Sequence, residues 1–186
     1  TIQVGCQESL GSIDPGLLSL DDPYNVSIKY VDSSDSDNQD MRGKWRLLYC
    51  VQYQHNAPEG QITWDGAGRV SPSIAYLMYW GCRYWGQESL WPNYRTGYGW
   101  KYDALATQYA VHIVNGEFSL NTLYNHLKGS KKEQFYSIIN KMVNDANHPP
   151  YYTPFADGWR DFDYALSDSS VTWTAQDYNC LLYTSP

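Results

Sequence analysis

The sequence predicts an α+β fold: a β-sheet or barrel-like framework built from both chain ends, with a helical subdomain inserted between them. Strand-like runs stand near both ends of the chain, and helix-like segments are grouped in the middle. Grouped elements of this kind are typical of α+β folds, whereas alternating ones would favour a parallel sheet. The 186 residues are the length of one domain. We therefore expect residues 1–186 to be a single domain whose residues 73–147 are mostly helical.

The strands are predicted from short runs of apolar and aromatic residues or from alternation with a period of two. Four runs have this character: residues 25–31, 45–52, 170–174 and 178–183. Residues 1–25 are interrupted by turn signals, of which Asp21-Asp22-Pro23 is the clearest, and we expect an irregular lead-in there. The acidic, serine-rich residues 32–40 are expected to form a solvated loop.

The helices are predicted from capping signals beside apolar segments. Ser71 suits an N-cap and Pro72 suits the first helical position, so we expect a helix over residues 73–80. Three more helices are expected over residues 103–114, 119–127 and 130–146. The last of them has Ser130 as its expected N-cap, with Glu133 at the capping-box position.

Charge and hydropathy exclude two classes of partner. The chain carries 13 Lys and Arg against 20 Asp and Glu, a formal net charge of −7, which is unsuited to phosphate backbones and anionic membrane surfaces. Its mean hydropathy is −0.57, and no run approaches the ~20 apolar residues of a membrane span. We therefore expect no nucleic-acid partner and no membrane insertion. Abundant Tyr and Trp, with only 18% charged residues, favour an extracellular protein with a binding surface.

The cysteines and histidines predict no metal or cofactor site. Four cysteines occur, far apart in the chain: Cys6, Cys50, Cys82 and Cys180. They lack the Cys-x-x-Cys spacing of zinc and redox sites, and the four histidines form no metal-binding pattern. Cys6 and Cys180 can form a disulfide if the two chain ends meet, with Cys82 as an alternative partner for either. The sequence alone does not choose among these pairings.

Two residues stand out because of where they lie. Cys50 is set in the apolar, aromatic run 45–52, and Gln108 lies on or beside the apolar face of the helix expected over residues 103–114. A cysteine in such a strand is commonly a small buried hydrophobe, and a glutamine in a helix commonly fills the surface. Taken alone, neither residue predicts a function.

Three motifs, in a particular order along the chain, relate Cys50 and Gln108 to a known family. The first is Tyr49-Cys50-Val51, the second is SIAYLMYWG at residues 73–81, and the third is ATQYAV at residues 106–111. In this order they resemble the thioester domains of Gram-positive bacterial surface adhesins and pilus-tip-type proteins. Those domains carry a cysteine in an aromatic strand and, later, a Thr-Gln-x-Ala helix. The resemblance covers roughly residues 45–127.

The resemblance implies an internal thioester between the Cys50 sulfur and the side-chain carbonyl of Gln108. An amine, expected to be a lysine of a host protein, would attack the acyl carbon and release the thiol. The resulting isopeptide-type bond is made once, so a single-turnover adhesin domain is implied and not an enzyme. No cofactor is needed. The resemblance also implies a cell-surface protein anchored to the cell wall through regions outside this chain. The chain opens without a signal segment, so we expect it to belong to a longer, already processed multidomain protein.

Helpers of this reaction are expected beside the pair. Tyr49 and Thr107 are its neighbours in the chain. His112 stands one helical turn after Gln108, where it can assist proton transfer, although a satisfied, half-buried histidine is the simpler interpretation. Cys82 is an alternative cysteine for the thioester, but it follows a helix end instead of lying in a strand.

Two other functions are kept as alternatives. The aromatic-rich residues 84–102 are typical of a surface that binds carbohydrates or proteins, so the first is a non-covalent extracellular binding module. The second is a cysteine hydrolase or transglutaminase-like enzyme with Cys50 as its nucleophile. Such nucleophiles usually sit at a helix N-terminus, and none is predicted beside Cys50.

Overall fold

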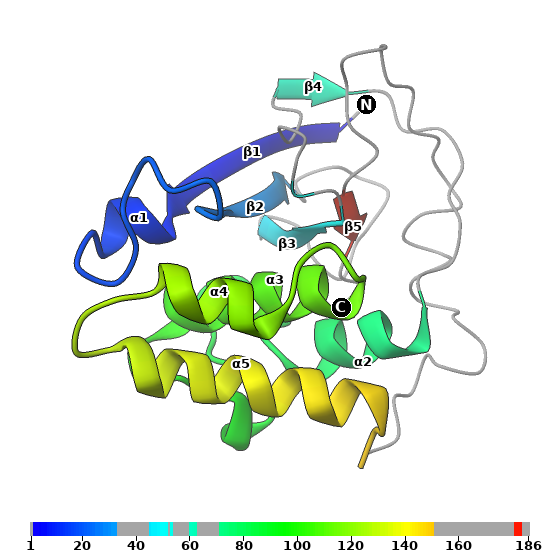
Figure 1. The fold of residues 1–186 in the computed structure, drawn as a ribbon. Coiled ribbons are helices and arrows are strands. Elements are labelled where there is room, and N and C mark those ends of the chain that lie inside the picture. The colour runs from blue at the N-terminus through cyan, green and yellow to red at the C-terminus, as the bar shows by residue number, and fades with distance from the viewer. Residues whose placement is uncertain are drawn as a thin grey trace.

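The structure, a computed structural model, combines an antiparallel sheet with a group of helices (Figure 1). It describes these residues: 2–32, 45–51, 53, 60–62, 71–150 and 181–183. In Figure 1 the strands form one layer, and most of the helices lie together on one side of it. This arrangement confirms the α+β class.

Five strands form the sheet: β1 (Ile2–Ser9), β2 (Ser27–Asp32), β3 (Trp45–Cys50), β4 (Gly60–Ile62) and β5 (Leu181–Tyr183). Their spatial order is β4-β1-β2-β3-β5, and the neighbours are antiparallel. β5 pairs with β3, with Leu181 opposite Cys50, so strands from both parts of the chain share one sheet, as predicted. Over the described residues this sheet is open, and its barrel-like closure stays a prediction.

The two strands expected over residues 25–31 and 45–52 are confirmed by β2 and β3. Of the strand expected over residues 178–183, only β5 is described. The strand expected over residues 170–174 and most of the loop 32–40 lie outside the described residues. β4 has no counterpart among the predicted strands, because three residues are too few to show an alternation.

The irregular lead-in predicted for residues 1–25 is confirmed over residues 14–25, which form turns and bends, but is wrong for the residues before them. This segment begins with β1, which continues directly into the short helix α1 (Leu10–Ile13). Apolar and polar residues do alternate at its start, but the turn signals that follow outweigh them in the sequence. α1 begins with a capping box, in which the hydroxyls of Ser9 and Ser12 each accept the other residue's N–H. Polar caps of this kind are short-range signals that a hydrophobic pattern does not reveal.

Four longer helices make up the second layer: α2 (Pro72–Trp80), α3 (Trp100–Val114), α4 (Leu120–His126) and α5 (Lys132–Asn147). A 3-10 turn, η2 (Pro92–Tyr94), precedes α3. The N-cap predicted at Ser71 is confirmed, since its hydroxyl accepts the Ile74 N–H at 3.3 Å. All four helices were predicted in this order.

Two helix starts differ from the prediction. α3 begins at Trp100 and not at Asp103. The Asp103 carboxylate lies inside the first turn and accepts the N–H groups of Ser89 and Thr96, so it fastens the preceding loop instead of opening the helix. α5 does not use Ser130 as its N-cap; Lys131 takes that position, without a side-chain cap.

α3 lies at the centre of the fold. Every residue from Asp103 to His112 is buried, because the sheet covers one side of the helix while α2 and α5 pack on others. Leu47 and Tyr49 of β3 belong to the same hydrophobic core. A polar side chain on any face of this helix therefore needs a partner within the protein.

Gly81, the C-cap of α2, allows this helix to lie close to α3. A Cβ at this position would lie 2.5 Å from the Leu77 carbonyl oxygen and 2.7 Å from Thr107 Oγ1. We expect Gly81→Ala to lower the free energy of unfolding by about 1–3 kcal/mol, as measured by urea unfolding. Gly16→Ala is the matched control, because its Cβ would meet only the Asp14 side chain, at 3.3 Å. Equal stability of the two variants would contradict the close packing of α2 on α3.

Candidate functional site

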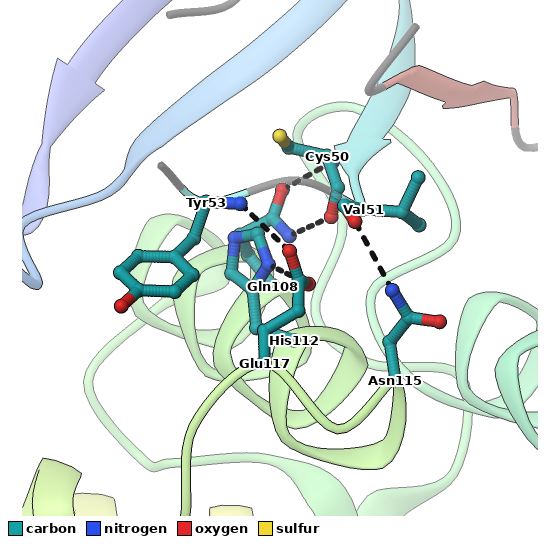
Figure 2. A network of polar contacts seen from close by, with 7 residues as sticks. All are labelled: Cys50, Val51, Tyr53, Gln108, His112, Asn115 and Glu117. Carbon is teal, nitrogen blue, oxygen red and sulfur yellow. Dashed lines mark hydrogen bonds and ion pairs between the residues drawn. The ribbon is translucent and has the colours of Figure 1, made fainter. Parts of the chain in front are cut away.

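The side chain of Gln108 is joined to the backbone of Cys50 by two hydrogen bonds (Figure 2). The Cys50 N–H donates to Gln108 Oε1 at 2.8 Å, and Gln108 Nε2 donates to the Cys50 carbonyl oxygen at 2.8 Å. Both residues are buried, each 2% exposed. The carboxamide thus binds the strand as the peptide group of a neighbouring strand would. The two residues singled out in the sequence are brought into contact.

The contact forms where β3 ends beside the middle of α3. A strand end leaves N–H and C=O groups without ladder partners, and buried ones have to be satisfied elsewhere. Gln108 offers one donor and one acceptor on a single planar group. The Cys50 sulfur is separated from the nitrogen that donates to Gln108 only by Cα and Cβ (Figure 2). Cys50 is the last residue of a strand and does not open a helix.

Two further side chains bind the chain that follows Cys50. Asn115 Nδ2 donates to the Val51 carbonyl oxygen at 3.0 Å, and the Tyr53 N–H donates to Glu117 Oε1 at 2.7 Å. These bonds fasten the residues after β3 to the end of α3 and to the turn behind it (Figure 2). Sequence reasoning missed both side chains, because the Asn-Gly pair at the end of α3 predicts only a helix end, which is confirmed.

His112 belongs to the same network. Its side chain is 1% exposed, and its Nδ1 lies 2.6 Å from Glu117 Oε2. A carboxylate only accepts hydrogen bonds, so Nδ1 carries the proton and Nε2 presents a lone pair. Burial lowers the pKa of His112 despite the opposing effect of Glu117, and the charge of Lys29 adds to the lowering. His112 is therefore a neutral imidazole at neutral pH, on the same side of α3 as Gln108.

Tyr49 and Thr107 make their described contacts with the backbone of Cys82. The Tyr49 hydroxyl donates to the Cys82 carbonyl oxygen, and the Cys82 N–H donates to Thr107 Oγ1 at 3.0 Å. Thr107 in turn donates to the Asp103 carbonyl oxygen at 2.8 Å. Burial raises the pKa of Tyr49 well above its usual value, so it acts as a neutral donor. Both predicted helpers thus fix the end of α2 against β3 and α3, next to the Cys50–Gln108 pair.

Cys82 is poorly suited to be the reactive cysteine. It is fully buried, and its sulfur lies 3.3 Å from the Gln87 carbonyl oxygen. Burial, followed by the charge of Asp103, raises the pKa of its thiol well above the usual value. A thiol held in the protonated form is a weak nucleophile. The disulfide between Cys6 and Cys180 stays a prediction, because Cys180 lies outside the described residues.

Two other kinds of feature are absent from the described parts of the chain. There, no three His, Cys, Asp or Glu side chains gather closely enough to hold a metal ion. Among the helices that the structure describes, none is long and apolar enough to cross a membrane.

A comparison of the chain with family models, curated proteins and solved structures finds no match. The site itself is therefore the basis for assigning a function.

The burial of His112 makes stability depend on pH. Because its pKa is lowered in the folded state, the unfolded chain binds the proton more readily once the pH falls below about 6.5. The stability contribution of the neutral imidazole is complete above that pH and is lost below it. We expect the free energy of unfolding to fall between about pH 7.5 and about pH 5, and His112→Gln to make this fall smaller.

Urea unfolding at several pH values measures this effect. His148→Gln is the control, because His148 is exposed. A pH dependence that is the same in His112→Gln and in the unmodified chain would show that His112 is not its source.

Proposed function

We propose that this chain is a covalent adhesin domain of a Gram-positive surface protein, in which Cys50 and Gln108 form an internal thioester. The observation that carries the proposal is the pair of 2.8 Å hydrogen bonds between the Gln108 carboxamide and the Cys50 backbone. It keeps the two reacting residues together before any covalent bond exists. The thioester would lie at the junction of sheet and helices, since β3 carries one partner and α3 the other.

Formation of the bond needs a nucleophile, an acyl group and a donor for the oxyanion. The Cys50 sulfur would attack Cδ of Gln108, which places negative charge on Oε1. The Cys50 N–H already donates to this atom, at 2.8 Å, and a donor aimed at the developing oxyanion lowers the barrier. Ammonia then leaves and takes up the thiol proton. One S–H and one C–N bond break, and one C–S and one N–H bond form.

The thioester would then capture a primary amine, which we propose to be a lysine of a host surface protein. The neutral amine attacks Cδ, the C–S bond breaks, and an amide joins the two proteins while the sulfur regains a proton. Lysine is an ammonium at neutral pH, so a base has to remove one proton first. We assign this role to His112, whose Nδ1 is held by Glu117 at 2.6 Å and whose Nε2 accepts. The bond forms once, so the domain is not a turnover enzyme.

Burial supports the lifetime of such a bond. A thioester is lost when water reaches it, and Cys50 and Gln108 are each only 2% exposed. Aromatic rings surround the proposed base: Tyr53 and Phe118 pack edge-on with centroids 4.9 Å apart, and both contact His112. An amine that enters past these rings would leave most of its water behind.

Intact mass spectrometry of the reduced, denatured protein tests the proposal. Loss of ammonia lowers the mass by about 17 Da, and methylamine then adds about 31 Da and frees one thiol. We expect both changes in the unmodified chain and neither in Cys50→Ala. The matched control Cys82→Ala should show both, because that thiol faces backbone carbonyl groups elsewhere in the core.

An intact Gln108 together with a Cys50 thiol in folded, freshly prepared protein would contradict the proposed thioester. Hydrolysis of a bond that had formed is distinguishable, because it leaves Glu at position 108 and a mass about 1 Da above that of the sequence. Mass changes that persist in Cys50→Ala and vanish in Cys82→Ala would assign the bond to Cys82.

A second candidate function rests on a pocket near the start of α3. It has a volume of about 470 Å³ and is lined by residues 86–90, Arg95, Gly99 and Trp100. An indole and a guanidinium are groups that stack on sugars or bind carboxylates, which supports the non-covalent binding module. The two functions are compatible, because a covalent adhesin also has to position its target amine. If the mass experiment finds Gln108 intact, this pocket becomes the leading site.

A further inference from the structure

A lysine is buried in the strand next to β3. Lys29 of β2 is 7% exposed, and its ammonium donates to the Ser27 carbonyl oxygen at 2.9 Å. Within the described part of the chain, no carboxylate forms an ion pair with it. A buried cation is costly unless nearby groups compensate its charge, and an ammonium has three donors to satisfy. Lys29 therefore indicates that a neighbouring group carries negative charge.

The register of the sheet brings Lys29 to the end of β3. Lys29 stands opposite Leu48 in the antiparallel pair of β2 and β3. Cys50, two residues further along β3, has its side chain on the same face and diagonal to Lys29. Diagonal neighbours are about 7–8 Å apart, within reach of a long side chain. The ammonium of Lys29 also turns toward the part of the sheet where Cys50 lies. It binds the Ser27 carbonyl oxygen, and Ser27 is the residue opposite Cys50 when the register of β2 and β3 is continued.

Among the residues that the structure describes, the other titratable groups around this point leave the ammonium without an anion. His112 of α3 is within range of its charge, as the lowered pKa of the imidazole shows, and is itself neutral. Both oxygens of Glu117 are engaged, one by His112 and one by the Tyr53 N–H. Cys6 of β1 stands directly opposite Lys29, whereas the ammonium bends along β2 toward Ser27. Of the described groups, Cys50 is thus the best placed to supply the negative charge.

We propose that Lys29 is the electrostatic partner of Cys50, and that its ammonium holds the sulfur as a thiolate before the thioester forms and again when an amine opens it. The second part rests on the proposed thioester, but the pairing of ammonium and thiolate does not. In formation the thiolate is the attacking species, and the proton that the thiol gave up to solvent on ionising is returned by solvent to the departing nitrogen, which leaves as ammonia. In opening, the electron pair of the C–S bond passes to sulfur. The ammonium stabilises that charge until the proton released by the amine reaches the sulfur.

The experiment measures alkylation of Cys50 by iodoacetamide at a series of pH values, in a Gln108→Ala chain that cannot form the thioester. Mass spectrometry of proteolytic peptides identifies the modified cysteine. We expect Lys29→Met to raise the midpoint of the Cys50 profile by about one pH unit or more, because a nearby opposite charge favours the thiolate. Lys29→Arg should keep the midpoint close to its starting value. Lys128→Met, at an exposed lysine, is the control with the same change of charge.

A Cys50 midpoint that does not move in Lys29→Met, or a shift found on Cys6 instead, overturns the pairing. If circular dichroism shows that the Met variant does not fold, Lys29→Gln replaces it in the same comparison. In chains that keep Gln108, the mass experiment tests the thioester separately. A shifted Cys50 midpoint without loss of ammonia supports the pairing of Lys29 with Cys50 and contradicts the thioester. Loss of ammonia with an unchanged midpoint supports the thioester and contradicts the pairing. A chain that has lost ammonia, keeps its thiol and resists methylamine has acylated an amine instead, and a Gln108–Lys29 cross-link among its proteolytic peptides also overturns the proposal.

Discussion

The buried carboxamide of Gln108 is the contact on which the arrangement of sheet and helices depends. Because α3 is covered on every side from Asp103 to His112, each polar side chain there has to find a partner inside the protein. Gln108 finds its partner in the Cys50 backbone, and Thr107 finds one in the Cys82 N–H. An unsatisfied buried donor or acceptor costs about 1–3 kcal/mol. The central helix and the end of β3 therefore fix each other's position.

The same contact has two consequences for the proposed chemistry. It aligns the acyl carbon with the strand that carries the thiol, and it directs the Cys50 N–H at the oxygen that would become negative. Loss of ammonia removes the donor that now binds the Cys50 carbonyl oxygen, so one of the two hydrogen bonds would be exchanged for a covalent bond. The Asn115 and Glu117 contacts with Val51 and Tyr53 do not involve the leaving group and would keep the chain after β3 in position.

Whether the sequence predicts an interaction depends on how far apart along the chain its two residues are. The caps at Ser71 and Ser119 act within three residues, and both helix starts were predicted to within one residue. Asn115 and Glu117 each bind a residue 64 positions away, and no local pattern records such a contact. β1 was missed because turn signals close behind it outweighed a short alternation. Cys50 and Gln108 were found through the order of three motifs, not through periodicity.

Adjacency in the sequence predicted the neighbours of the Cys50–Gln108 pair less well than the geometry of the strand and the helix does. Tyr49 precedes Cys50, but successive strand residues point to opposite faces, so its hydroxyl reaches Cys82. Thr107 precedes Gln108, but one residue turns a helix by about 100°, which aims its hydroxyl elsewhere. His112 was better placed by the helical repeat, and it is more deeply buried than the half-buried histidine that was the simpler expectation.

The pairing of β5 with β3 has a mechanical consequence. Leu181 stands opposite Cys50, so a late segment of the chain is hydrogen-bonded to the strand that touches Gln108. Tension applied on the C-terminal side would enter the sheet through β5 and pass over β3 to α3 along a short path. If a target were attached at residue 108, the applied force would follow this path between β5 and α3. β1, β4 and α5 then lie outside it, and strain would concentrate at the strand end and not spread through the core.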